Sequence, residues 1–276
     1  MTVRPSNAAF FDVDETLIAA KSMFDFLRFW TARCGDDTGY ERVVSRLRDM
    51  AERGVPRAVT NREYYRYFRG VPLTELRAAG ADWYARYRRR PDAFVTATLD
   101  ELHRHRARRT TIVLVSGSFP ACLEPLAEEL HADLVLCTEP LVGPDGRLTG
   151  EVRQPMIGAA KAAAVRDVIA ARGLVAADCY GYGDHVSDLE MLLQVGHPVV
   201  VGTDPVLLEH AGRHGWRRLP ADAGPVAVDD TGPAPARTGT AAVDAAPDRP
   251  VDVTPDEHVD PTPAQPVGTA VPRTAT

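Results

Sequence analysis

Hydrophobic positions in the chain follow two patterns, continuous runs and helical repeats. Five segments are short, nearly unbroken apolar runs: 8–13, 110–116, 133–139, 178–183 and 198–202. Four segments between or after the later runs repeat apolar residues at helical spacing: 119–131, 158–173, 187–195 and 204–215. Strands buried on both faces read as continuous apolar runs, and their alternation with helices is typical of parallel sheets. The pattern predicts a doubly wound α/β core with a mostly parallel sheet.

A long helical segment separates the first apolar run from the others. Its apolar residues recur about every 3.6 positions, with Gly54, Gly70 and Pro72 as breaks and Pro91 as a favourable helix start. Helices are expected at 22–34, 40–54, 60–70, 73–90 and 91–109. The sequence therefore predicts an all-helical domain, residues 21–109, inserted after the first strand.

Residues 222–276 differ in composition from the rest of the chain. They hold ten of the 22 prolines, and nine acidic residues against three arginines give a balance of −6, which equals the net charge of the whole chain. The segment shows no periodicity and offers little apolar surface to offset its ordering entropy. We expect a disordered tail whose removal leaves stability and turnover unchanged.

Other features narrow the class of protein. No run of eighteen apolar residues occurs, and the first ten residues, MTVRPSNAAF, lack the basic start and apolar stretch of a leader, so a cytoplasmic protein without membrane association is expected. The four cysteines form no C-x-x-C pair, which argues against a zinc cage or disulfides and predicts buried thiols.

Side chains that can bind metals, act as nucleophiles or transfer protons follow three of the predicted strands. Asp12 and Asp14 follow the first, Ser116 and Gly117 the second, and Asp184 a later one. Ligands of open α/β sheets bind at the carboxyl ends of the strands, so these residues are expected to share one site. Converging carboxylates repel one another unless a cation lies among them, and hard oxygen ligands suit Mg²⁺. In this arrangement Asp12 is suited to act as metal ligand and nucleophile, and Asp14 as acid and base.

Other residues around these strand ends are suited to holding a phosphoryl group. Ser116 offers a hydroxyl, and Gly117 allows close approach to its backbone N–H, just before a helix start with its positive dipole end. Lys161 supplies a fixed positive charge. Taken singly, each motif has an ordinary structural explanation as a turn, a helix cap or a surface lysine, and only their conjunction predicts phosphoryl transfer.

The ordered set D-V-D-E-T, S-G-S, a lone lysine and G-Y-G-D-H-V-S-D resembles the motifs of the haloacid dehalogenase superfamily. The resemblance covers 8–219 and is to its phosphoserine-phosphatase-like branch, in which a helical cap lies between the first two motifs of a Rossmann-like core. It implies that Asp12 is the nucleophile and that Asp14 is the acid and base. It also implies that Ser116, Gly117 and Lys161 bind phosphate.

The same resemblance implies a metal site. Asp12, the backbone carbonyl of Asp14 and the carboxylate of Asp184 would be its ligands, with Asp188 close to the metal. Thr16 would shape the loop. Glu15 stands where many members have Gly or Ser, and Ser187 stands where phosphoserine phosphatases often have Asn.

Lys21 is a further departure from the family pattern. Phosphoserine phosphatases of this branch typically carry a glutamate nine residues after the nucleophile, where it meets the ammonium group of the substrate. Counting from Asp12, that position is Lys21. We expect Lys21 to affect substrate specificity and phosphoserine to be a poor substrate, unless the side chain simply points to solvent.

The resulting expectation is a Mg²⁺-dependent phosphomonoesterase for a small phosphorylated metabolite, working through an aspartyl-phosphate. Residues 1–20 and 110–221 would form the catalytic core, 21–109 the cap and 222–276 the tail. The alternatives are a phosphoserine phosphatase proper, a sugar or cyclitol phosphatase of a biosynthetic pathway, and a non-catalytic phosphate-binding regulatory protein. Residues 61–70 interleave aromatic and basic side chains, and they are expected to form an amphipathic cap helix that packs its Tyr and Phe inward rather than to bind nucleic acid. The oligomeric state is left open.

Overall fold

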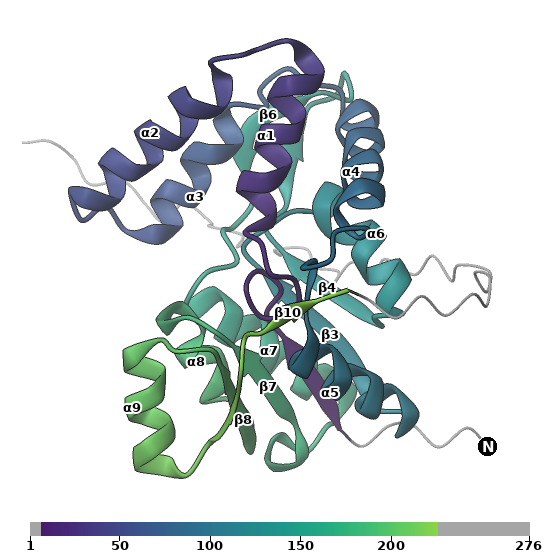
Figure 1. The fold of residues 1–276 in the computed structure, drawn as a ribbon, viewed down its shortest axis with the longest axis vertical. Helices are drawn as coiled ribbons and strands as arrows, with labels where there is room; N and C mark the ends of the chain where they lie inside the picture. Colours follow the sequence, from purple (N-terminus) through teal and green to yellow (C-terminus); the bar gives the residue numbers. More distant parts are fainter. Residues whose placement is uncertain (1–6, 226–276) are drawn as a thin grey trace, which may run out of the picture. The chain divides into compact units, whose positions relative to one another are not determined.

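The central sheet has six strands, all parallel, in the order β4-β3-β1-β7-β8-β9. The computed structural model describes residues 7–225. From the central strand β1 the chain builds the sheet outward to β3 and β4 on one side and to β7, β8 and β9 on the other, so the predicted doubly wound α/β fold is confirmed (Figure 1). The strands span Ala8–Phe11 (β1), Thr111–Ser116 (β3), Leu134–Cys137 (β4), Tyr180–Gly183 (β7), His197–Val201 (β8) and Arg217–Leu219 (β9).

Helices cover both faces of this sheet. Alternate residues of a strand point to opposite faces, and the fully buried Phe11 and Phe10 accordingly belong to two different core clusters. The cluster of Phe11 includes side chains of α5 and α6, and that of Phe10 includes side chains of α7, α8 and α9. These helices span Thr96–Ala107 (α5), Pro120–Leu130 (α6), Ala159–Arg172 (α7), Leu189–Leu192 (α8) and Pro205–His214 (α9).

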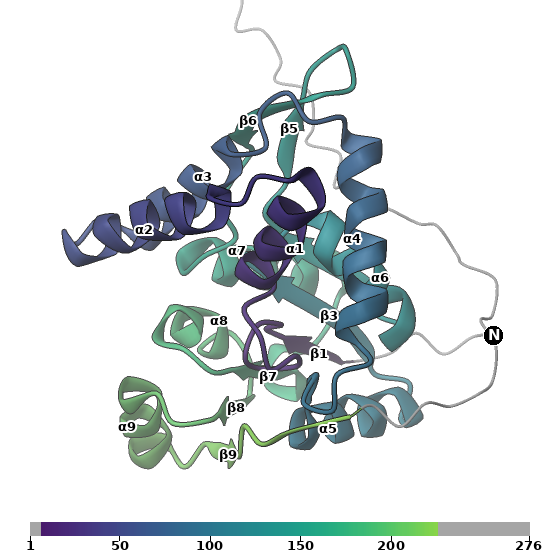
Figure 2. The ribbon, with the colours of Figure 1, turned by 45° about the horizontal axis from the view of Figure 1, so that its top comes forward.

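The insert after β1 contains four helices, which lie beyond the carboxyl end of β1 (Figure 2). They are α1 (Ser22–Cys34), α2 (Gly39–Glu52), α3 (Arg57–Arg66) and α4 (Leu73–Tyr87). The prediction that the aromatic residues of 61–70 pack inward is confirmed, because Tyr64, Tyr65 and Phe68 are almost fully buried around Phe119 at the start of α6. Among residues 7–225, no helix has the length and apolar character needed to cross a membrane.

A two-stranded hairpin, which the hydrophobic pattern did not predict, packs on these helices. Its strands are β5 (Pro140–Val142) and β6 (Leu148–Val152), and β6 contacts α3. Backbone hydrogen bonds join it to the insert, from the Gly70 amide to the Leu148 carbonyl at 2.7 Å and from the Leu148 amide to the Val71 carbonyl at 2.8 Å. The segment 143–146, Gly-Pro-Asp-Gly, is a turn signal that could have revealed the hairpin. The four inserted helices are therefore extended by a hairpin that comes from a later part of the chain.

The predicted helix over 91–109 is wrong in its first five residues. Phe94–Val95 form a short strand, β2, and α5 starts only at Thr96 and packs on β3 of the sheet. The strand forms because the two connections between sheet and insert run side by side. The Val95 amide donates to the Leu17 carbonyl at 2.9 Å, and the Ala19 amide donates to the Ala93 carbonyl at 3.0 Å.

The first residues of the predicted tail are also ordered. Ala223–Gly224 form β10, which pairs antiparallel with β2, and the Thr96 amide donates to the Asp222 carbonyl at 3.0 Å. The expectation of a tail from 222 onward therefore fails for 222–224, because the open edge of β2 offers these residues backbone partners. The remaining part of the predicted tail, 226–276, lies outside the described residues.

Ending the chain after Ala221 should destabilise the protein relative to a chain that ends after Pro225. The shorter chain lacks β10, so the backbone groups of β2 and of Thr96 lose partners. We expect a loss of about 1 kcal/mol, or roughly 2–4 °C in Tm for a domain of this size. Calorimetry on the two chains measures it, and equal Tm values would show that β10 contributes nothing.

His105 on α5 should make the folding stability depend on pH. It is buried and shares a 2.9 Å hydrogen bond with the Tyr182 hydroxyl, and burial lowers its pKa to about 4 from the usual 6.5. Because the unfolded chain then binds the additional proton, stability is full above pH 6.5 and falls as the pH drops toward 4, by about 2 kcal/mol between pH 7 and pH 5. Urea denaturation at pH 7 and pH 5 should show that His105→Gln loses less folding stability between these two pH values than the unsubstituted protein does.

The matched control for that experiment is His103→Gln, since His103 lies on the same helix and is exposed. The two histidines therefore lie on different faces, as their spacing predicts. The His103→Gln variant should keep the acid sensitivity of the unsubstituted protein. If His105→Gln also keeps it, another group is responsible.

Candidate active site

Asp12 stands at the end of the central strand and is held there by its neighbours. Its amide donates to the Tyr182 carbonyl of β7 at 2.9 Å, so the residue is fixed between two strands. The chain then turns tightly, with the amides of Leu17 and Ile18 both donating to the Val13 carbonyl. The loop 13–18 is consequently anchored at both ends, and the side chain of Asp12, which is only 6% exposed, faces the carboxyl edge of the sheet.

Lys161, from the first turn of α7, reaches the same place. Its ammonium nitrogen Nζ lies 2.5 Å from Oδ1 of Asp12 and 2.6 Å from Oδ1 of Asp188, and the residue is only 3% exposed. Burial lowers the pKa of Lys161, but the two carboxylates more than offset this, so the pKa lies above its ordinary value and the lysine is charged. The structure thus brings Lys161, Asp12 and Asp188 into one buried ionic cluster.

Asp184, which follows β7, completes a group of three carboxylates. One oxygen from each of Asp12, Asp184 and Asp188 lies within 4.8 Å of the other two. Asp184 accepts a 2.9 Å hydrogen bond from the hydroxyl of the buried Thr16, which ties the first loop to the last motif. Burial and the charges of Asp12 and Asp188 raise the pKa of Asp184 to about 9, and burial with the Asp188 charge raises that of Asp12.

The single positive charge of Lys161 does not balance the charges of three converging carboxylates. A hard divalent cation with oxygen ligands would supply the missing positive charge. The donor set, carboxylate oxygens at the carboxyl edge of a sheet, has the chemistry that Mg²⁺ requires, so these residues fit a magnesium ion.

Asp14, two residues after Asp12, lines the open cavity rather than joining the three carboxylates. Its Oδ1 is buried and has no hydrogen-bond partner among the described residues. Burial raises its pKa to about 7, an increase that the nearby Ser22 limits. A carboxyl group with this pKa exchanges a proton easily near neutral pH, which suits acid and base chemistry.

Ser116 is the last residue of β3, Gly117 follows it, and both line the same cavity. The Ser116 hydroxyl accepts from the Ser118 amide at 3.1 Å, which shapes the turn. A Cβ on Gly117 would lie 2.6 Å from the end of the Ile157 side chain, which would have to shift to make room for it. The Gly117 carbonyl accepts hydrogen bonds from Asn61 and Tyr65 of α3, at 2.9 and 3.1 Å, so the insert is joined directly to this turn.

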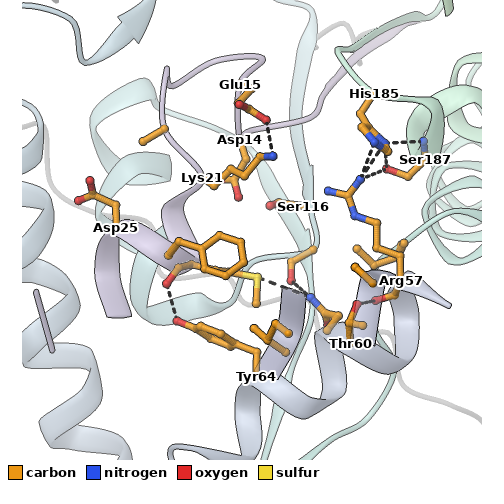
Figure 3. Close-up of a pocket in the computed structure, with 18 of the residues that line it drawn as sticks. Asp14, Glu15, Lys21, Asp25, Arg57, Thr60, Tyr64, Ser116, His185 and Ser187 are labelled. Atoms are coloured by element: carbon orange, nitrogen blue, oxygen red, sulfur yellow. Dashed lines mark hydrogen bonds and ion pairs between the residues drawn. The ribbon is translucent and has the colours of Figure 1, made fainter. Parts of the chain in front are cut away.

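A cavity of about 670 Å³ opens between these residues and the inserted helices (Figure 3). The sequence motifs line its floor, and residues of α1, α2 and α3 line the rest. Figure 3 shows Asp14, Lys21 and Ser116 around this space, with Tyr64 on the opposite side. The Tyr64 hydroxyl donates to the Met23 carbonyl at 2.7 Å, which fixes α3 against α1.

Arg57, at the start of α3, makes a second contact between insert and core. Its Nη1 lies 2.7 Å from Nδ1 of His185 and 3.4 Å from the Ser187 hydroxyl (Figure 3). His185 also caps the short helical turn that follows it, by accepting from the Ser187 amide at 3.0 Å. Burial and the Arg57 charge lower the pKa of His185. No local sequence signal connects Arg57 with His185, because their contact depends on how the insert folds back.

Lys21 lies at the mouth of the cavity and forms an ion pair with Glu15, with 3.2 Å between Nζ and Oε2. Both side chains are roughly half exposed, at 48% and 45%. Glu15 has a φ of 61°, a left-handed conformation that glycine adopts without strain. Two of the three departures from the family pattern, Glu15 and Lys21, are thus in contact.

Comparisons with known proteins agree with this architecture. Residues 9–193 match the sequence profile of the haloacid dehalogenase-like hydrolases. The chain is 31% identical over 227 residues to the "Inhibition of morphological differentiation protein" of Streptomyces azureus, a match that covers 77% of each chain. It is 30% identical over 248 residues to "Probable phosphatase Rv3661" of Mycobacterium tuberculosis, covering 88% of this chain and 84% of that protein.

The fold is also that of a solved enzyme structure, a substrate-bound phosphoserine phosphatase. The TM-score is 0.56 at 19% identity, with 75% of this chain and 90% of that chain covered. The family match and these two relatives show that the chain belongs to the haloacid dehalogenase-like hydrolases, and its fold is similar to that of a phosphoserine phosphatase.

Proposed function

We propose that this hydrolase is a Mg²⁺-dependent phosphomonoesterase that acts on a small phosphorylated metabolite through an aspartyl-phosphate on Asp12. The observation that supports it most is the buried Lys161, which holds Asp12 by a 2.5 Å contact on the floor of the cavity. A fixed cation beside a carboxylate, with Ser116 and Gly117 next to it, is an arrangement for binding and attacking a phosphoryl group.

The proposed reaction has two displacements. The carboxylate of Asp12 attacks phosphorus, the ester P–O bond breaks, and Asp14 gives its proton to the departing alkoxide oxygen. Asp14 then takes a proton from water, whose oxygen attacks the phosphorus of the aspartyl-phosphate, so that phosphate leaves and Asp12 is restored. Lys161, the Ser116 hydroxyl and the Gly117 amide hold the phosphoryl oxygens through both steps.

Asp12, Asp184 and the main-chain carbonyl of Asp14 would hold the Mg²⁺ ion, with Asp188 beside it. When bound, the ion neutralises negative charge on the phosphoryl group and on the converging carboxylates. The inserted helices, joined to the phosphate-binding turn through Asn61 and Tyr65, form the cap of the site. A closed cap excludes bulk water from the reaction.

The test is phosphate release from p-nitrophenyl phosphate by the purified chain. We expect turnover with Mg²⁺, loss of it with excess chelator, and recovery when Mg²⁺ is restored. The intact set of Asp12, Asp14, Lys161 and Asp184 favours this over a non-catalytic phosphate-binding protein. Phosphate binding without turnover, in the presence of Mg²⁺, would support that alternative.

Phosphoserine should be a poor substrate because of Lys21. Phosphoserine and 3-phosphoglycerate differ chiefly in an ammonium group instead of a hydroxyl, and an ammonium group near Lys21 is a like-charge contact on the order of 1 kcal/mol. We expect kcat/KM for 3-phosphoglycerate to exceed that for phosphoserine about fivefold or more. Steady-state kinetics would measure the ratio, and a preference for phosphoserine would instead support a phosphoserine phosphatase proper.

The matched variant for this prediction exchanges the two charges, Glu15→Lys with Lys21→Glu, so that the ion pair is kept. The exchange should shift the ratio toward phosphoserine. An unchanged ratio would show that Lys21 does not select the substrate. A sugar or cyclitol phosphate preferred over both acids would point to a phosphatase of that class.

A further inference from the structure

The cavity extends well beyond the catalytic residues, into the space between α1 and α2. Its volume of about 670 Å³ falls within the range of about 300–1,000 Å³ that is usual for pockets that hold drug-sized ligands. A phosphoryl group with a two- or three-carbon leaving group needs only the part next to the sheet. The remaining space is a candidate binding site for a larger leaving group.

One face of each helix lines this space. Lys21, just before α1, and the lining residues Phe24 and Arg28 are spaced by three and four positions, which places them in one row along the helix, with Met23 and Asp25 on either side of Phe24 also lining the cavity. The lining residues of α2 recur at the same helical spacing: Tyr40, Val44, Leu47, Arg48 and Ala51. The middle of the space is therefore apolar, and an arginine stands on each wall.

These two arginines carry uncompensated charge. Neither Arg28 nor Arg48 has an ion pair within the described part of the chain, residues 7–225, and Arg28 instead lies over the ring of Tyr40 at 4.1 Å. Asp25, which also lines the cavity, is already engaged by Arg90 at 2.7 Å and by the indole N–H of Trp83 at 2.8 Å. This end of the cavity consequently attracts anions, and guanidinium groups bind carboxylate or phosphate in a bidentate manner.

We propose that Arg28 and Arg48 form a distal anion subsite, which receives a carboxylate or phosphate at the far end of the substrate. The apolar side chains of Phe24, Val44 and Leu47 contact the part between. This inference rests on the proposed function and names its substrate class, an elongated phosphomonoester with an apolar middle and a terminal anion. Arg28 lies two helical turns beyond Lys21, about 10 Å along α1, so the terminal anion must be far from the phosphate that is cleaved.

Two series of synthetic esters test the subsite. In the first, ω-carboxyalkyl phosphates are compared with n-alkyl phosphates of the same length. In the second, α,ω-alkanediol bisphosphates replace the ω-carboxyalkyl phosphates. Comparing the two series shows whether the subsite prefers a carboxylate or a phosphate. For each chain length we compare kcat/KM of the ester that ends in an anion with kcat/KM of the n-alkyl phosphate. We expect this ratio to rise with chain length, to tenfold or more once the chain is long enough to reach Arg28.

The double variant Arg28→Gln, Arg48→Gln should bring that ratio close to one at every length. Its matched control, Arg33→Gln with Arg46→Gln, removes the same charge from the same helices. Those arginines do not line the cavity and pair with Asp82 and Glu63 instead. The control should keep the chain-length dependence of the unsubstituted protein.

Two failures are distinguishable. If no monoester, including p-nitrophenyl phosphate, is hydrolysed with Mg²⁺, the proposed function itself fails. If monoesters are hydrolysed but the ratio stays near one, or both double variants lower it equally, the distal subsite fails while the proposed function stands.

Discussion

Asp12→Asn should reduce kcat by more than a thousandfold and leave the fold intact. An amide is a poor nucleophile and a weaker metal ligand than a carboxylate, so the first displacement loses its attacking group. A thousandfold loss corresponds to about 4 kcal/mol of transition-state stabilisation. The amide has nearly the shape of the carboxylate, and Lys161 keeps its 2.6 Å contact with Asp188. Steady-state kinetics and circular dichroism on the same preparation would measure both effects.

Two comparison variants sharpen this result. Asp14→Asn should slow both proton transfers by roughly a hundredfold to ten-thousandfold and still allow phosphorylation of Asp12. Asp167→Asn, an exposed carboxylate on α7, should behave as the unsubstituted protein. Activity of Asp12→Asn within about tenfold of the unsubstituted protein would exclude nucleophilic catalysis by Asp12.

Lys161→Met should cost both stability and activity. The substitution leaves Asp12 and Asp188 buried next to each other without their shared cation, at 6% and 1% exposure. Removing one partner of a buried ionic cluster costs about 3–5 kcal/mol, and we expect a loss of about 3 kcal/mol in the free energy of unfolding. The phosphoryl group would also lose its fixed positive charge, so turnover should fall at least a hundredfold. Urea denaturation and kinetics would measure the two losses.

The control for Lys161→Met is Arg166→Met on the same helix. Arg166 is exposed, and within residues 7–225 its side chain makes one long hydrogen bond, at 3.4 Å to Gln194, so its loss should change stability by less than about 0.5 kcal/mol. If Lys161→Met is as stable as Arg166→Met, the buried ionic cluster does not contribute the expected amount of about 3 kcal/mol to the free energy of unfolding.

Continuous apolar runs made the core of the fold predictable. β1, β3, β7 and β8 are buried on both faces, and parallel pairing of such strands brings their carboxyl ends together at one edge. Asp12, Lys161 and Asp188 meet at that edge although 149 and 27 residues separate Lys161 from the two acids. Motif order alone was enough to predict this meeting, because the topology of the fold leaves little freedom there.

The short strands could not be predicted in the same way. β9, Arg217–Leu219, is a three-residue edge strand with two arginines, and β10 is two residues long. Neither carries an apolar pattern, and each forms only because a neighbouring strand edge supplies backbone partners. The same is true of β2, whose residues read as part of a helix.

The sequence also did not predict which residues line the cavity. Helical spacing indicated that α1 and α2 are amphipathic, but it did not show which side of each helix faces the catalytic edge. The meeting of Arg57 with His185 depends on tertiary packing in the same way. The prediction of buried thiols is correct for Cys122 and Cys179, holds only in part for the partly buried Cys137, and is wrong for Cys34, the exposed last residue of α1.

The most direct measurement of the central claim is chemical trapping of the phosphorylated aspartate. The chain is mixed with p-nitrophenyl phosphate and Mg²⁺, quenched during turnover, treated with borohydride and analysed by peptide mass spectrometry. Reduction converts an aspartyl-phosphate to homoserine, so we predict homoserine at position 12 and at no other aspartate, with none when substrate or Mg²⁺ is left out. Turnover under the same conditions without homoserine at position 12, in a trial where a synthetic acyl phosphate is fully reduced, would contradict the account.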